Sequence, residues 1–309
     1  MRLVQYDNGG QLGVGVEVGE QVFYTGYPDM LSFIHDGDRA MDRANQAARA
    51  DGRPVQFDKL AAPITNPGKI FGSGPNYLGH GREDPDWVPA DEPQWDFIKL
   101  ASSITGPYDD IVIPPADDVI VRGPGSSARF AAEHGFAVDW EVELAVVLGA
   151  TAKNVHRDDA GDYIFGYTIL NDVSARSVQF EFNQRDLGKN FDTFAPMGPC
   201  IVTKDEITDL REMRLESFVN GEQKQSDLVA DQLHLPEVAI EWLSSIIRLD
   251  PGDVLSTGTP AGIGTFADPV QFLQIGDVVR CTASTIGHIE NHVVLGSNRR
   301  NAPRTSAAR

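Results

Sequence analysis

Residues 139–149 read Asp-Trp-Glu-Val-Glu-Leu-Ala-Val-Val-Leu-Gly, an apolar run that carries two glutamates two positions apart. The run is typical of a buried β-strand. In a strand, side chains at i and i+2 leave the same face about 6–7 Å apart. We therefore expect Glu141 and Glu143 to point together, while Trp140 and the residues at 142, 144 and 146 take the other face.

Two carboxylates on one buried face require a compensating charge, because an unpaired ion removed from water is costly. The possible partners are a shared proton, an Arg or Lys side chain, or a divalent metal ion. The competing interpretation is an edge strand whose polar face meets solvent, since glutamate is usually exposed. The run alone does not decide between these readings.

The bulk composition restricts the class of partner. The chain has 309 residues, is 41% hydrophobic and carries a formal net charge of −19, so it can bury a large core in one or two domains. Such an acidic chain is a poor partner for nucleic acid or an anionic membrane, and a site for an anionic substrate would need local cations or a metal. Cys200 and Cys281 lack metal-ligand spacing and are predicted to be buried free thiols.

The chain in order suggests a small unit followed by a larger one. Residues 2–24 read as short strands and residues 29–50 as a helical pattern, and prolines near residue 62 mark a boundary. We predict a small N-terminal β/α domain over 1–62, a catalytic domain over 63–297 and a disordered polar tail over 298–309. The N-terminus has no hydrophobic signal region, and no stretch reaches the roughly 20 apolar residues of a membrane span, so we expect a cytoplasmic protein.

Two further segments carry chemistry. A glycine-rich turn after the strand 69–72 delivers His80 and Glu83, which share a face if a helical turn forms. The strand 163–170 ends at Asp172, which either caps a following helix or faces the cavity of Glu141 and Glu143. In the second reading, Arg176 and Gln179 project towards that cavity from the first helical turns.

Six ordered blocks over residues 69–295 resemble the fumarylacetoacetate hydrolase family. They are Gly-x-Asn-Tyr-x-x-His (74–80), Glu-x-Glu-Leu (141–144), Asn-Asp-Val-Ser-Ala-Arg (171–176), Lys-x-Phe-Asp-Thr-Phe-x-Pro-x-Gly-Pro (189–199), Val-Asn-Gly-Glu (219–222) and Gly-Thr-Pro-x-Gly (258–262). The resemblance implies an α+β fold that is mainly β, a mixed β-sandwich roll, in a protein that is usually a homodimer. Two segments, 84–95 and 123–137, look longer than is usual for the family, and for this reason the resemblance does not identify the substrate.

The resemblance also implies the site. Glu141, Glu143 and Asp172 would hold Mg²⁺, or else Mn²⁺ or Ca²⁺, and three carboxylates without a soft ligand suit such a hard cation. His80, Glu83 and Lys189 are the expected catalytic residues, with the histidine as a base that the glutamate orients. The expected substrate-binding residues are Tyr77, Arg176, Gln179 and Thr259.

The function that these residues indicate is metal-dependent hydrolysis of a carbon–carbon bond in a 2,4-dioxo acid, with His80 and Glu83 activating water. Decarboxylation or isomerisation of a 2-oxo acid, or hydrolysis or dehydration of a sugar-derived keto acid, remains an alternative on the same metal site. A binding protein without turnover is a third reading, opposed by the presence of every expected site residue. Product analysis with several 2-oxo acids would separate the three.

Overall fold

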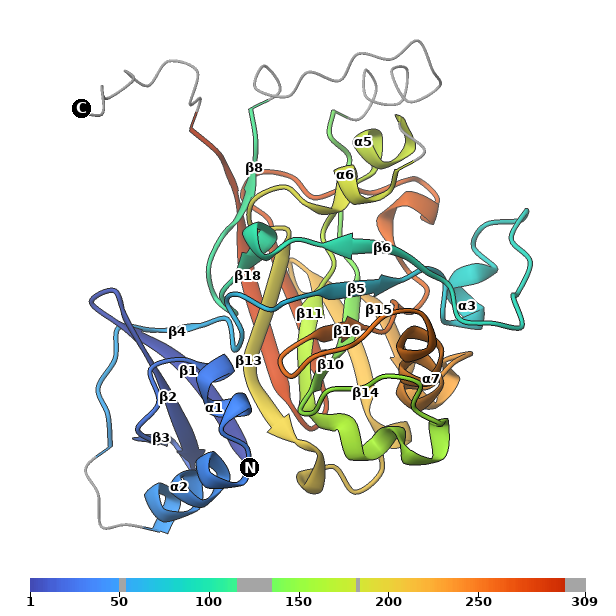
Figure 1. Ribbon diagram of the computed structural model, residues 1–309. Helices are drawn as coiled ribbons and strands as arrows, with labels where there is room; N and C mark the ends of the chain where they lie inside the picture. Colours follow the sequence, from blue (N-terminus) through green and yellow to red (C-terminus); the bar gives the residue numbers. More distant parts are fainter. Residues whose placement is uncertain (50–53, 116–134, 182–183, 298–309) are drawn as a thin grey trace, which may run out of the picture.

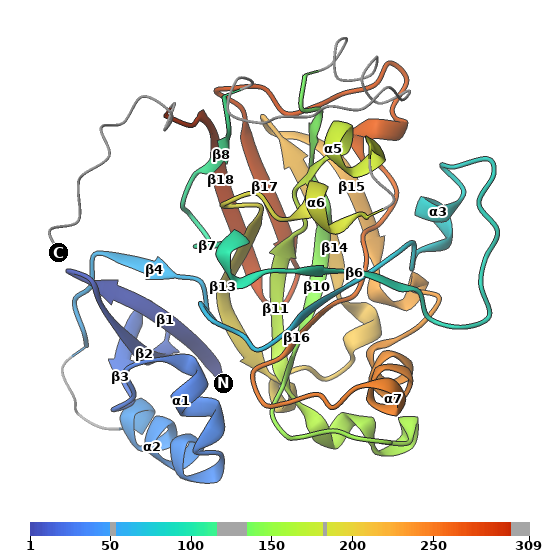
Figure 2. The same cartoon turned by 45° about the horizontal axis from the view of Figure 1, so that its top comes forward.

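The computed structural model describes residues 1–49, 54–115, 135–181 and 184–297 (Figure 1). The predicted disordered tail at 298–309 and most of the segment 123–137 lie outside these residues. The chain forms a body of two sheets, with the N-terminal strands and helices on one side of it (Figures 1 and 2). The α+β class with a predominance of strands, predicted above, is confirmed.

Two larger sheets and one small ribbon make up the strands. The first has eleven strands in the order β3-β2-β1-β13-β11-β10-β16-β5-β6, with β4 beside β1 and β7 beside β13, and the second has five in the order β15-β14-β17-β18-β8. The strands of the first are β1 (Arg2–Asn8), β2 (Gln11–Val18), β3 (Gln21–Tyr24), β4 (Lys59–Ala61), β5 (Ile70–Ser73), β6 (Trp95–Lys99), β7 (Ile104–Thr105), β10 (Val142–Leu148), β11 (Ile164–Asn171), β13 (Ala195–Thr203) and β16 (Val254–Ser256). Those of the second are β8 (Ile111–Ile113), β14 (Arg214–Val219), β15 (Glu222–Leu228), β17 (Val278–Ala283) and β18 (Gly287–Leu295), while β9 (Val138–Asp139) pairs with β12 (Ser174–Ala175).

The strand β10 lies in the middle of the large sheet, between β11 and β16, and every residue of it is buried. Trp140, Val142 and Leu144 belong to the core between the two sheets, where β10, β11 and β13 pack against β14, β17 and β18. Ala145 and Val147 face the other way, into a second core. The edge-strand interpretation of this run is therefore wrong, and the predicted separation of its two faces is confirmed.

The N-terminal residues continue the large sheet. Leu3 of β1 pairs with Ile201 of β13, and the second core joins the N-terminal helices to Ile70 and to the back of β10. The helical pattern predicted over 29–50 forms two helices, α1 (Met30–His35) and α2 (Asp38–Arg49), because Gly37 turns the chain at φ +56°. The strands and helices before residue 62 thus share a sheet and a core with the rest of the chain.

The remaining helices lie around the rim of the sheets. They are α3 (Leu78–Gly81), α5 (Arg176–Glu181), α6 (Asp186–Lys189) and α7 (Pro236–Ile246), with short 3₁₀ helices at Ala101–Ser103, Arg157–Tyr163, Lys204–Glu206, Leu210–Glu212, Val229–Asp231 and Gly264–Phe266. Among the described residues, no helix combines the length and the apolar character needed to cross a membrane. Cys200 and Cys281 are buried free thiols, as predicted.

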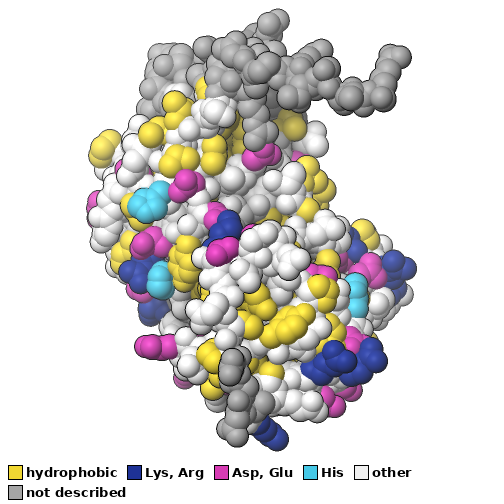
Figure 3. All heavy atoms as spheres, turned by 90° about the vertical axis from the view of Figure 1, so that its left-hand side faces the viewer, with side chains coloured by type: hydrophobic (Ala, Val, Ile, Leu, Met, Phe, Trp, Pro, Cys, Tyr) yellow, Lys and Arg dark blue, Asp and Glu magenta, His cyan; other side chains and the backbone are white. Residues whose placement is uncertain are grey.

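On the face seen in Figure 3, Lys and Arg side chains lie in small groups, with acidic, apolar and neutral side chains between the groups.

Candidate active site

Three carboxylates meet where β10 begins and β11 ends. Val142 pairs with Asn171 across these antiparallel strands, and the Asp172 amide donates to the Glu141 carbonyl at 2.9 Å. The ligand oxygens of Glu141, Glu143 and Asp172 all lie within 4.8 Å of one another, and the three residues are at most 5% exposed. Asp172 lies between β11 and β12, before α5 begins at Arg176, so the helix-cap reading of this residue is wrong.

Two of the carboxylates are neutralised by basic side chains. Lys189 Nζ lies 2.8 Å from Glu141 Oε2 and 2.5 Å from Asp172 Oδ2. Arg176 Nη2 donates to Glu141 Oε1 at 2.6 Å. Burial alone would raise the pKa of Glu141, but the charges of Lys189 and Arg176 outweigh it and hold that pKa well below its usual range.

A third cation, Lys99, was not predicted from the sequence. It ends β6, its side chain is fully buried, and Nζ donates to Asp172 Oδ1 at 2.5 Å, to the Lys189 carbonyl at 2.6 Å and to the Val173 carbonyl at 3.4 Å. Three acceptors match the three N–H bonds of an ammonium group, although burial lowers the pKa of this lysine. In the sequence, Lys99 and Phe97 lie two positions apart in a short strand and therefore share a face. This spacing does not reveal that the shared face points into the protein.

Glu143 differs from the other two acids because, within the part of the chain that the structure describes, no basic side chain forms an ion pair with it. Its Oε2 accepts from Ser256 Oγ at 2.6 Å and from the Gly258 amide at 3.0 Å. Gly258 reaches this position at φ +89°, where an added Cβ would lie 2.9 Å from the Cβ of Asn76. Burial, followed by the charges of Asp172 and Glu141, raises the pKa of Glu143 to about 8.

This donor set fits a hard divalent cation. All three ligands are carboxylates, converging and buried, and the most crowded of them favours its protonated form in the absence of a further positive charge. Such oxygen-only sites suit Mg²⁺, Mn²⁺ or Ca²⁺ and leave positions for a substrate. The ion would ionise Glu143 by supplying the missing charge.

We expect metal binding to strengthen as pH rises towards 8. The pKa of Glu143 is raised from 4.5 to about 8 in the folded protein, so the stability that its proton contributes is fully present below pH 4.5 and is lost as pH rises through 8. Below pH 8 a metal must displace that proton, which weakens binding by up to about tenfold per pH unit. The rise in Tm on adding Mn²⁺ should be larger at pH 8.5 than at pH 6.0, and an equal rise at both values would contradict this assignment.

His80 and Glu83 form the predicted pair. His80 lies in α3, and its Nδ1 is 2.8 Å from Glu83 Oε2, while Glu83 Oε1 accepts from the Gly262 amide at 2.8 Å. The carboxylate therefore fixes the imidazole and ties it to the Gly258–Gly262 turn. This arrangement leaves Nε2 as the nitrogen available for proton transfer.

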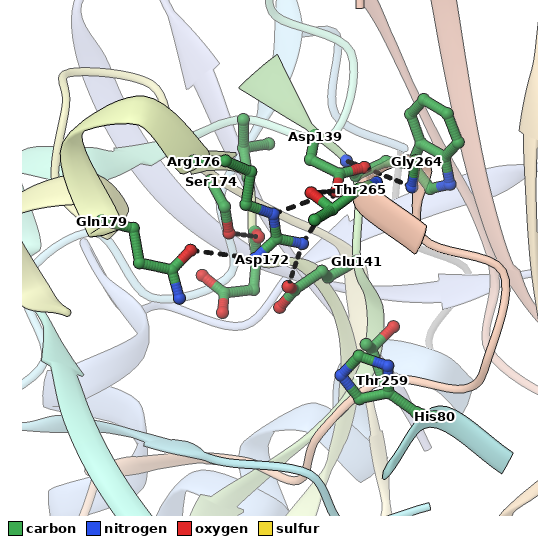
Figure 4. Close-up of polar contacts among 12 residues, drawn as sticks. His80, Asp139, Glu141, Asp172, Ser174, Arg176, Gln179, Thr259, Gly264 and Thr265 are labelled. Carbon is green, nitrogen blue, oxygen red and sulfur yellow. Dashed lines mark hydrogen bonds and ion pairs between the residues drawn. The ribbon is translucent and has the colours of Figure 1, made fainter. Parts of the chain in front are cut away.

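Arg176 is held by residues from both sides of the site (Figure 4). Its Nε donates to Asp139 Oδ2 at 3.0 Å and its Nη1 to Gln179 Oε1 at 3.0 Å. Asp139, also absent from the sequence-based prediction, is fully buried and accepts from the Gly264 and Thr265 amides as well. Its position next to Trp140 in an apolar run was the signal that could have marked it as a buried partner of a cation.

The other two predicted substrate-binding residues differ in their positions. Thr259 lines the cavity, but its hydroxyl donates to the Val142 carbonyl at 2.9 Å and accepts from Gln225 Nε2 at 2.7 Å. Tyr77 is fully buried, is not among the residues of the cavity wall, and its hydroxyl accepts from Gln232. We therefore do not assign Tyr77 a contact with substrate.

A cavity of about 630 Å³ opens in front of the carboxylates. Glu141, Glu143, Arg176, Gln179 and Lys189 line one part of it, and His80 lies in the same wall. The wall also includes residues between 84 and 97, Trp242 of α7 and residues of the 263–266 turn. The cavity thus joins a charged, polar end to a largely aromatic one.

Comparisons with known proteins identify one family. Residues 69–294 match the profile of the family described as fumarylacetoacetate (FAA) hydrolase C-terminal. The chain is 38% identical over 308 residues to oxaloacetate tautomerase fahd2, mitochondrial, of Xenopus laevis, covering 95% of this chain and 90% of the relative. It is 37% identical over the same length to oxaloacetate tautomerase FAHD2A, mitochondrial, of Homo sapiens, covering 95% and 92%.

Solved structures of similar proteins share the fold of this chain. A putative HpcE protein from Mycobacterium smegmatis has a TM-score of 0.83 at 29% identity, covering 96% of this chain and all of that one. Maleylpyruvate hydrolase from Sphingobium sp. SYK-6, solved with manganese(II) and pyruvate, has a TM-score of 0.74 at 27% identity with the same coverage. The cytoplasmic location and the homodimer expected from the sequence remain predictions.

Proposed function

The chain belongs to the fumarylacetoacetate hydrolase family of enzymes, and on this premise we propose that it interconverts the keto and enol forms of a 2-oxo acid. The observation that carries the proposal is the pair His80–Glu83, at 2.8 Å, in the wall of the cavity that also holds the carboxylates. Tautomerisation needs one base close to a 2-oxo acid whose keto oxygen is stabilised as it gains charge. The site has one such base and a cluster of cations.

Each residue then has a role. Glu141, Glu143 and Asp172 would hold a divalent ion, Mg²⁺ by preference, whose positive charge would polarise the keto oxygen of a bound 2-oxo acid. His80 takes the proton from C3 of the keto form and, once protonated, gives a proton to the oxygen of the enolate, which completes the enol; both transfers run backwards in the reverse direction, with Glu83 keeping the ring in place. Lys189 and Arg176 add positive charge beside the oxygen atoms that become more negative.

The comparisons favour proton transfer over bond cleavage. The curated relatives at 37–38% identity over 95% of this chain are named oxaloacetate tautomerases. Tautomerisation also requires less of the site, because it needs no water positioned for attack on a second carbonyl.

Hydrolysis of a 2,4-dioxo acid is the second candidate. It is supported by the size of the cavity, which extends well beyond the carboxylates, and by the likeness to a maleylpyruvate hydrolase. In this reaction His80 would activate a water that attacks the distal carbonyl, and the bond between C3 and C4 would break to release an acid and the enol of pyruvate. The two reactions share the metal site and the base, and they differ in whether a carbon–carbon bond breaks.

Product analysis separates these reactions. Purified protein with Mg²⁺ or Mn²⁺ should accelerate the loss of the enol absorbance of oxaloacetate or phenylpyruvate without releasing pyruvate or carbon dioxide. Glu141→Ala serves as the metal-site control and should abolish the effect. Pyruvate formed from an acylpyruvate would identify the hydrolase, carbon dioxide from oxaloacetate would identify a decarboxylase, and no metal-dependent change in any substrate would favour a sugar-derived acid or a binding role.

A further inference from the structure

The cavity is larger than a four-carbon acid needs. Its volume of about 630 Å³ falls in the range of roughly 300–1,000 Å³ that is typical of sites for drug-sized ligands. The carboxylate cluster occupies one end, where a 2-oxo acid would place its carboxylate and keto oxygens. The remaining volume therefore faces the other end of the substrate.

From the aromatic side chains that line the cavity we single out Trp87, Trp242 and Phe266, which we call the distal wall. The ring of Trp87 packs against Gly81, next to His80, where an added Cβ would lie 2.4 Å from it. The Phe266 ring centroid is 6.3 Å from that of His80. Trp242 Nε1 lies 3.5 Å from Glu92 Oε2, which sets this side chain against the segment that carries Trp87.

An apolar group of the substrate would bury more of the exposed surface of the distal wall than a polar one would. Phe266 is 41% exposed, and both tryptophans are only partly buried, so a flat group between them would remove aromatic surface from water. Stacked or edge-on aromatic pairs contribute beyond the burial of area alone. The wall thus selects for a planar, apolar distal group.

The charges of the cavity disfavour a distal carboxylate. Among the described residues of its wall, the Lys and Arg side chains are Arg176, Arg185 and Lys189. The first and third are bound to Glu141, and Arg185 Nη1 lies 2.6 Å from Asp96 Oδ2. A second carboxylate on the substrate would compete with Asp96 for Arg185, or with Glu141 for Arg176 and Lys189, in a protein whose net charge of −19 already repels anions.

We propose that the substrate is a 2-oxo acid with an uncharged aromatic distal group, and that Trp87, Trp242 and Phe266 select for it against dicarboxylic acids. The inference rests on the proposed function, because it assumes that a 2-oxo acid binds at the carboxylate cluster. It separates this chain from relatives whose name specifies oxaloacetate, which carries a carboxylate at both ends.

Binding rather than turnover tests the inference. Calorimetry on the full chain loaded with Mn²⁺ would compare pyruvate, 2-oxoglutarate and 4-phenyl-2-oxobutanoate, which share the 2-oxo acid and differ in the distal group. The phenyl compound should bind at least about tenfold more tightly than pyruvate, and 2-oxoglutarate no more tightly than pyruvate. Tighter binding of 2-oxoglutarate than of the phenyl compound would overturn the inference.

Substitutions assign the effect to the wall. Trp87→Ala and Trp242→Ala should each remove most of the advantage of the phenyl compound and leave the affinity for pyruvate unchanged. Val88→Ala is the matched control, because Val88 is 76% exposed on the same segment and does not line the cavity. Asp96→Asn should free Arg185 and increase the affinity for 2-oxoglutarate alone. An unchanged ranking in all three cavity variants would overturn the assignment.

The outcome is independent of the reaction. Tautomerisation of oxaloacetate and phenylpyruvate without the predicted ranking of affinities would overturn this inference and leave the proposed function intact. The ranking without any tautomerisation would overturn the proposed function and support the aromatic selectivity of the cavity.

Discussion

Asp172→Asn should lower the free energy of unfolding of the metal-free protein by about 3–5 kcal/mol, the usual cost of leaving a buried ion without its partner. Asp172 accepts from Lys99 at 2.5 Å and from Lys189 at 2.5 Å, and the side chain of Lys99 is completely buried. Asparagine keeps the shape but removes the charge that compensates both lysines. The loss should appear as a lower midpoint in urea unfolding with EDTA present.

Glu143→Gln is the matched control, because it removes an adjacent carboxylate of the same cluster. The pKa of Glu143 is raised to about 8, so at pH 7 the metal-free protein already holds this group largely protonated, and glutamine imitates that state. We expect its stability to be above that of the parent at pH 7 and further above it at pH 9, because the unfolded parent gains free energy by ionising this carboxyl group above pH 4.5 and glutamine cannot ionise. Both variants should lose the rise in Tm on adding Mn²⁺.

Equal destabilisation by the two substitutions would contradict the division of charge described here. It would mean that Glu143 is ionised in the metal-free protein and that the lysines compensate all three acids together. Stability measured at pH 7 and pH 9 for the parent and both variants separates these cases.

His80→Asn should reduce turnover by about 10²–10⁴-fold, the usual contribution of a positioned general base. Asparagine can still donate to Glu83, as His80 Nδ1 does at 2.8 Å, but it cannot accept a proton at neutral pH. Metal binding should be unaffected, because the imidazole is not among the three carboxylate ligands. The measurement is kcat for enol loss together with the Mn²⁺-induced change in Tm.

Glu83→Gln completes this comparison, since a glutamine that keeps its oxygen on the Gly262 amide at 2.8 Å turns its NH2 group, a donor only, towards His80 Nδ1. Nδ1 then accepts and Nε2 carries the ring proton, so we expect a loss of turnover comparable to that of His80→Asn. A His80→Asn enzyme with nearly full kcat would exclude this residue as the base, whatever its effect on substrate affinity.

The sequence predicted which acidic residues meet at the site, but it did not predict which side chains neutralise them. Glu141 and Glu143 share a face because of the two-residue period of a strand, and Asp172 follows the next strand along the chain, so their convergence could be anticipated. That Val142 pairs with Asn171, and hence that the three acids meet, depends on a register that no local pattern encodes. The register follows from the packing of both sheets.

The residues that were missed and the position of Tyr77 outside the cavity wall have the same origin. Lys99 and Asp139 compensate charges that lie 73 and 37 positions away along the chain, so their role exists only after folding. Tyr77 lies in a motif that reaches the site, yet its side chain turns into the core and pairs with Gln232. Direction of a side chain at the end of a short strand or turn depends on tertiary packing, which overrides the local sequence.

The central place of β10 and the peripheral origin of the distal wall have a consequence for engineering. Metal ligation depends on strands in the interior of an eleven-stranded sheet, while selectivity depends on one connecting segment, one helix and one turn at the rim. Exchanging the connection 84–94 would retarget such an enzyme without disturbing its ion site. The scaffold can therefore diversify in substrate range by changes in these rim elements, because its reactive centre and its recognition surface are inherited through separate parts of the chain.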